Sequence, residues 1–133
     1  MVLLLSYVKD YFWSYLVKLI KVNEIPEKVL KIGKGKWIDE TQGTSKLGLV
    51  FAEIEPGLPP PRYHYHERRE HMHIILEGKA KFTVEGKEHF VEENTVVLTP
   101  PGEKHRWENI GDTTLRFIEA YAPIELDEVN LID

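Results

Sequence analysis

The histidines of this chain are gathered in one short segment. Six of the 133 residues are histidine, and four of those six fall within ten residues. These four are His64, His66, His71 and His73. Imidazole suits Zn, Cu, Fe and Ni, so the cluster indicates a transition-metal site. The chain has no cysteine, which excludes thiolate ligands and disulfides and leaves His, Asp, Glu or water to hold an ion.

The spacing of the first histidine pair is typical of a strand rather than a helix. The next histidine after His66 comes five residues on, which does not fit the helical zinc-protease motif. The proline run at 59–61 also opposes a helix there. On an extended strand, His64 and His66 share one face, roughly 7 Å apart, and both rings can reach one ion. In the next strand His71 and His73 share a face, so if one points inward the other does too.

The elements that must position these residues are short β-rich runs separated by turn signals. Closely spaced strands with no helical pattern between them predict an all-β antiparallel sandwich or barrel. Strands are expected at 28–32, 46–55, 72–76, 79–85, 87–91, 95–98, 106–109 and 114–122.

The N-terminal segment has a different pattern. Polar residues recur at helical spacing over residues 3–21, which predicts an amphipathic helix there. The rest of its surface is broad and apolar, and we expect it to pack against the barrel or a second subunit, with attachment to a membrane surface as the alternative. The expected organisation is a helical extension over residues 1–22 and one β-barrel domain over residues 23–133.

The overall composition excludes several classes of protein. Hydrophobic residues make up 42% and charged residues 29%, and the net charge of −5, with no basic stripe, argues against nucleic-acid binding. Lys9, Asp10 and Lys18 interrupt the apolar start, so no membrane span is expected. The start lacks the basic region and cleavage site of a signal peptide, and a cytoplasmic protein is the default.

The segment around the histidine cluster resembles the first motif of the cupin family. That motif is a glycine, then His-x-His, then three or four residues to a glutamate, then six to a second glycine. The matching residues here are Gly57, His64-Tyr65-His66 and Gly78. Counting back from Gly78, the acidic ligand position falls on His71, and Glu70 is the alternative third ligand. We favour His71, which gives an all-histidine site.

A second segment resembles the other cupin motif, Pro-x-Gly-x-x-His-x-x-x-Asn. The matching residues are Pro100, Gly102, His105 and Asn109. The resemblance covers about residues 49–122 and implies a double-stranded β-helix, that is, a jelly-roll barrel. The metal ligands that it implies are His64, His66, His71 and His105. They would hold one divalent transition metal ion, which could be Zn, Fe, Mn, Ni or Cu.

The cupin fold supports isomerases, dioxygenases, decarboxylases, epimerases and non-catalytic sensors, so the fold does not select a function. Residues 78–84 and 101–109 are similar to the cupin domain of type II mannose-6-phosphate isomerases. That similarity implies a metal-dependent enzyme acting on a sugar phosphate or another small oxygenated substrate. An Fe- or Cu-dependent dioxygenase and a non-catalytic protein that binds a small ligand such as a sugar are the alternatives. His73 is the predicted catalytic base or proton relay, with Glu53 as a second candidate. Small cupins commonly pair, so a homodimer is expected.

Overall fold

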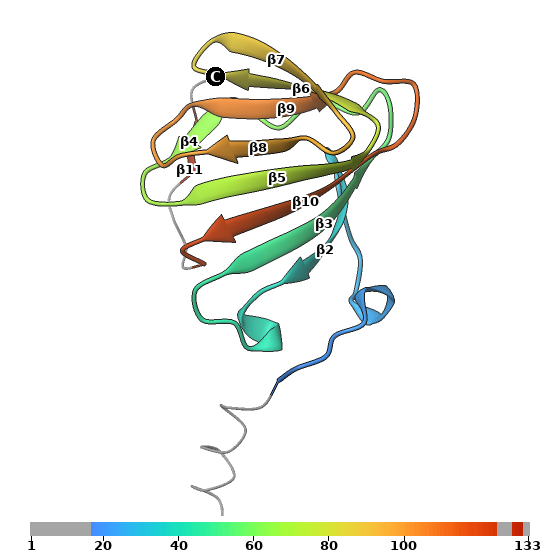
Figure 1. Ribbon diagram of the computed structural model, residues 1–133, viewed down its shortest axis with the longest axis vertical. Coiled ribbons are helices and arrows are strands. Elements are labelled where there is room, and N and C mark those ends of the chain that lie inside the picture. Colours follow the sequence, from blue (N-terminus) through green and yellow to red (C-terminus); the bar gives the residue numbers. More distant parts are fainter. Residues whose placement is uncertain (1–16, 125–128, 132–133) are drawn as a thin grey trace, which may run out of the picture.

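The computed structural model describes residues 17–124 and 129–131, which form two antiparallel sheets (Figure 1). The first sheet has the order β1 (Lys28–Leu30), β2 (Gly33–Ile38), β3 (Gly48–Ile54), β10 (Leu115–Ala122), β5 (Glu70–Glu77) and β8 (Val96–Thr99). The second has the order β11 (Val129–Leu131), β4 (His64–His66), β9 (His105–Asn109), β6 (Lys79–Val84) and β7 (Lys87–Glu92). The predicted all-β jelly-roll fold is confirmed.

The core lies between the two sheets because each contributes its inward-facing residues. Strand β3 alternates buried and partly exposed positions along its length, so Val50, Ala52 and Ile54 face inward. Ala80 and Phe82 on β6 face them from the other sheet and are fully buried. This alternation is the period-two pattern of a strand with one face on a core. It also determines which polar side chains point into the barrel.

Strand β2 was not predicted, because glycine is disfavoured in strands and this strand contains two. Both glycines allow the close approach of a neighbouring group. A Cβ on Gly33 would lie 2.4 Å from Ile54 Cδ1, and one on Gly35 would lie 2.9 Å from the Trp37 ring. Packing therefore requires the residues that make the strand hard to recognise. The short strand β11 was also missed.

The expected N-terminal helix falls mostly on residues 1–16, which lie outside the described residues. Residues 17–21 are described and are not helical, so the prediction of a helix as far as residue 21 is wrong at that end. Val17, Ile20 and Val22 are β-branched, which disfavours helix there. The Lys18 ammonium donates to the Gln42 carbonyl at 2.8 Å and ties this stretch to the barrel. The two 3-10 turns are η1 (Val22–Glu24) and η2 (Glu40–Gln42).

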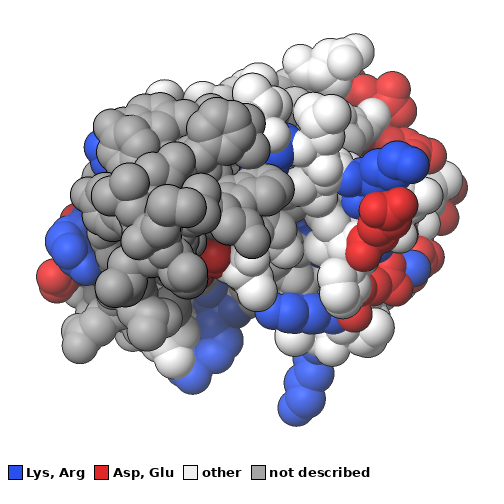
Figure 2. Space-filling view, turned by 90° about the horizontal axis from the view of Figure 1, so that it is seen from below, with Lys and Arg blue, Asp and Glu red and all other residues white. Residues whose placement is uncertain are grey.

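The charged residues on the described surface are mixed in sign. In the view of Figure 2, basic and acidic side chains lie interspersed. Ion pairs such as those of Lys34 with Glu27 and with Glu53 also join charges of opposite sign. Among the described residues, no helix is long and apolar enough to cross a membrane.

Candidate metal centre

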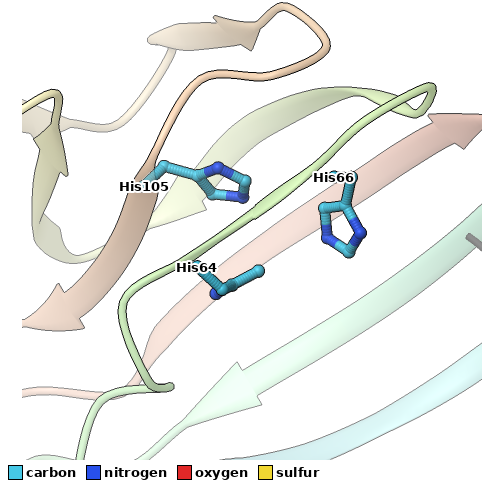
Figure 3. Close-up of side chains that lie close together, drawn as sticks. All are labelled: His64, His66 and His105. Carbon is cyan, nitrogen blue, oxygen red and sulfur yellow. The ribbon is translucent and has the colours of Figure 1, made fainter. Parts of the chain in front are cut away.

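Three of the predicted metal ligands lie together where strands β4 and β9 meet. His64 and His66 come from β4, and His105 from β9 is the cross-strand partner of His64. One potential ligand atom from each lies within 4.8 Å of those of the other two, and the three rings gather around one space (Figure 3). His66 and His105 are buried and His64 is half-buried. These three histidines are close enough to hold one metal ion.

Strand β5 presents two further histidines to the same interior. His71 and His73 are only 5% and 1% exposed, whereas Glu70 and Met72 between and beside them are exposed. The expectation that His71 and His73 share the inward face is confirmed. The side chain of Glu70, the alternative third ligand, faces the other way.

His71 lies beside the group of three without belonging to it. Its ring centroid is 4.7 Å from that of His66 and 5.5 Å from that of His105. His73 lies deeper, with its ring centroid 5.0 Å from that of Phe82 and 5.4 Å from that of Phe117. Of the two histidines on β5, His71 therefore lies beside the group of three, while His73 lies at the apolar end of the cavity.

The histidines line a cavity of about 260 Å³ inside the barrel. Its walls are largely apolar, with Trp37, Val50 and Phe117 among the lining residues. Such walls exclude water and strengthen electrostatic interactions inside the cavity. The cavity is suited to a small ligand.

Hydrogen bonds to backbone carbonyls orient two of the rings. The Nδ1 atom of His64 lies 2.6 Å from the Arg62 carbonyl oxygen, and that of His105 lies 2.9 Å from the Glu103 carbonyl oxygen. A carbonyl can only accept, so Nδ1 carries the proton in both rings and Nε2 keeps its lone pair. Histidines that ligate metal ions make this kind of contact through their other ring nitrogen.

Several buried polar atoms in this region have no hydrogen-bond partner among the described residues. They are His66 Nδ1, His71 Nε2, His73 Nδ1 and Thr99 Oγ1. An unpaired buried polar atom costs about 1–3 kcal/mol, so it requires an explanation. A cation bound by the lone pairs of His66 Nδ1 and His71 Nε2 would give two of these four atoms a partner. The donor set therefore fits a metal ion held by imidazole nitrogens.

The charge state of the buried histidines also suits a metal ion. Burial, reinforced by the neighbouring histidines, lowers the pKa of His66 to about 4. Burial likewise lowers the pKa of His105 to about 4, although its hydrogen bond to the Glu103 carbonyl acts in the opposite direction. Both rings are therefore neutral near pH 7, and a neutral imidazole is the form that binds metals.

One residue of the cavity was missed from the sequence. Glu119 on β10 accepts a hydrogen bond from His71 Nδ1 at 2.5 Å, and its other oxygen lies 3.6 Å from His73 Nε2. Burial alone would raise its pKa, but the neighbouring His73 ring and the hydrogen bond from His71 lower the pKa of Glu119 well below its ordinary value. In the sequence, Glu119 could have been recognised as the one carboxylate that shares alternate positions of the predicted strand 114–122 with Leu115, Phe117 and Tyr121.

Glu53, a predicted candidate base, and His89 both lie outside the cavity. Glu53, the second candidate base, occupies an outward position on β3 and forms ion pairs with Lys34 at 3.5 Å and Arg116 at 3.6 Å. The period-two alternation of β3 explains this placement, since Ala52 and Ile54 take the inward positions. His89 is exposed on β7.

Known proteins with similar chains agree with this architecture. The chain belongs to the cupin family, because residues 50–121 match the model of the cupin domain. It is 41% identical over 79 residues to a mannose-1-phosphate guanylyltransferase of Salmonella montevideo, covering 59% of this chain and 17% of that protein. The mannose-1-phosphate guanylyltransferases that it matches are much longer, and the chain spans 16% to 23% of their length.

Two other similar proteins are closer to this chain in length. An oxalate-binding protein of Thermotoga maritima is 31% identical over 111 residues, covering 75% of this chain and 89% of that protein. A sugar phosphate isomerase of the cupin superfamily from Silicibacter pomeroyi has a similar structure, with a TM-score of 0.77 at 16% identity. That likeness covers 87% of this chain and 82% of the isomerase, and it concerns the fold alone.

Proposed function

We propose that this protein binds one divalent transition metal ion through four histidines and uses it to act on a small oxygenated substrate. The ligands are His64, His66, His71 and His105. The observation that carries the proposal is the convergence of these four rings on one small cavity, with the buried atoms His66 Nδ1 and His71 Nε2 unpaired. Zn, Fe, Mn, Ni and Cu remain the candidate metals, and imidazole ligands favour all of them except Mn.

The residues of the cavity suit isomerase-like chemistry. A bound ion would polarise a carbonyl or hydroxyl oxygen of the substrate. Apolar walls exclude water from the reacting group, and Glu119 and His73 lie within reach of each other to hold a proton. Arg69 also lines the cavity, where its guanidinium donates to the Pro123 and Ile124 carbonyls and lies over the Tyr121 ring. Its positive charge favours an anionic substrate.

A sugar phosphate is the substrate class that we propose first. The names of the guanylyltransferases and of the structurally similar isomerase both concern phosphorylated sugars. The second candidate is binding of a small dicarboxylate without turnover. The modest cavity and the extended similarity to the oxalate-binding protein of Thermotoga maritima favour it.

Elemental analysis tests the proposal directly. Protein purified without a histidine tag should carry about one transition metal ion per chain, because imidazole ligands select such ions. Calorimetric titration of the metal-loaded protein with mannose 6-phosphate and with oxalate then separates the two substrate classes, and NMR of the sugar phosphate detects isomerisation. A protein that binds either ligand equally well without metal would contradict metal-dependent function. Bound Fe or Cu together with O₂ uptake would instead favour the dioxygenase alternative.

The choice between His71 and Glu70 gives a paired prediction. His71→Ala should weaken metal binding strongly, because it removes a buried ring whose Nε2 has no other partner. Glu70→Ala should leave the affinity unchanged, because this side chain is exposed on the opposite side of β5. Competition with a chelator measures both variants. The reverse order would restore Glu70 as the third ligand.

A homodimer remains a prediction. The outer side of strands β5 and β8 exposes the neighbouring apolar residues Met72, Leu76, Val96 and Leu98. The sequence of residues 1–20 is also rich in apolar residues. Light scattering should therefore give twice the chain mass for the full protein and a lower mass after deletion of residues 1–21. A monomeric full chain would contradict the dimer, and an unchanged mass after deletion would exclude a role for the N-terminal segment.

A further inference from the structure

Among the described residues that line the cavity, Glu119 is the one carboxylate. It lies on β10, the strand between β3 and β5, and is the cross-strand partner of His73. On the same face, the next pair along these strands joins Tyr121 and His71. Glu119 is therefore placed opposite one histidine and diagonal to the other, within reach of both.

The contact with His71 determines the state of that ring. The carboxylate oxygen of Glu119 lies 2.5 Å from His71 Nδ1 and accepts a hydrogen bond from it, so the proton of His71 lies on Nδ1. The other nitrogen, Nε2, then carries the lone pair, and it is buried without a partner. Without the carboxylate, His71 would be able to turn or to move its proton to Nε2, and either change would remove the lone pair from the interior.

Electrostatics gives a second reason for a carboxylate at this position. Four neutral imidazoles bring no negative charge to a divalent cation. A dication in a largely apolar cavity is costly unless a negative charge lies nearby. Glu119 would supply that charge one imidazole ring away, and a carboxylate on the far nitrogen also makes the histidine a more basic ligand.

We propose that Glu119 is the positioning residue of the metal centre, acting through the hydrogen bond that it accepts from His71 Nδ1. This inference rests on the proposed metal function. Glu119 does not touch the ion in this arrangement. It holds His71 in the one tautomer and orientation that can ligate.

The test measures Zn²⁺ affinity by chelator competition in the full chain. Glu119→Gln keeps an acceptor but loses the charge, and should weaken binding about 10-fold; Glu119→Leu loses both, and should weaken binding about 100-fold. Glu53→Gln is the matched control, because Glu53 is a carboxylate on the adjacent strand β3 that faces outward, and it should bind as the wild type does. Equal affinity of all four proteins would overturn the inference.

A double-mutant cycle shows whether Glu119 acts through His71. Glu119→Leu should weaken binding in the wild-type background but change it little in His71→Ala, since the ring that it orients is then absent. Equal losses in both backgrounds would overturn the inference. A wild-type protein that binds no metal would instead contradict the proposed function.

A spectroscopic readout is independent of metal loading. In the metal-free protein, nitrogen-15 NMR should show His71 protonated at Nδ1 in the wild type. The same ring should become a mixture of tautomers in Glu119→Leu, while His105, whose Nδ1 is bonded to a backbone carbonyl, should not change. An unchanged His71 tautomer would overturn the inference, even if the substitution also lowered stability.

Discussion

Replacing His105 with alanine is expected to weaken binding of a divalent transition metal ion by more than about 100-fold. Loss of a residue that only hydrogen-bonds to a metal ligand costs up to about 100-fold in affinity, and loss of a ligand itself should cost more. His105 comes from a different strand than His64 and His66 and completes the group of three. Its loss leaves only the pair on β4 and the more distant His71. Because the site is buried, the missing nitrogen is not readily replaced by bulk solvent.

His89→Ala is the matched control for this substitution. His89 is a histidine of the same sheet, but it lies on the edge strand β7, which β6 separates from β9, and it is exposed there. Metal content and chelator-competition affinity should therefore match the wild type. If His105→Ala retained wild-type affinity, the ion would have to bind elsewhere and the proposed site would be incorrect.

The metal-free protein should lose stability as the pH falls from about 6.5 to about 4. Burial lowers the pKa of both His66 and His105 from 6.5 to about 4. In this interval the unfolded chain binds protons at these residues and the folded protein does not, so the free energy of unfolding decreases as the pH falls. The shift corresponds to about 3 kcal/mol for each histidine. Urea unfolding at several pH values in the presence of a chelator measures it.

A non-titrating substitution shows whether these histidines cause the effect. His105→Gln should lose roughly half of the pH dependence, since two histidines share it. His89→Ala should keep all of it. A stability that is flat between pH 6.5 and pH 4 in the wild type would contradict the low pKa values. In the same interval, bound metal should dissociate, because protons compete for the ligand nitrogens.

Much of the site could be predicted because its signals are local. The spacing of His64 and His66 follows from the period of a strand, and the same period places His71 and His73 on one face. The two motifs around His66 and His105 indicated the fold. Glu53 shows the limit of this reasoning, because the sequence alone does not say which face of its strand is inward.

The histidine ligand types, the all-β class and the pairing of neighbours on a strand were determined by the sequence, since residue chemistry and strand period are local properties. The tertiary structure decided which distant residues meet. Strand pairing brings His105 opposite His64 and places Glu119 beside His71, 48 residues away in the chain. Sheet register joins such residues through contacts between strands, and packing allows two glycines in β2. Sheet register and packing are not local properties of the sequence. Only the folded chain therefore shows that Glu119 lies in the cavity and that Glu70 does not.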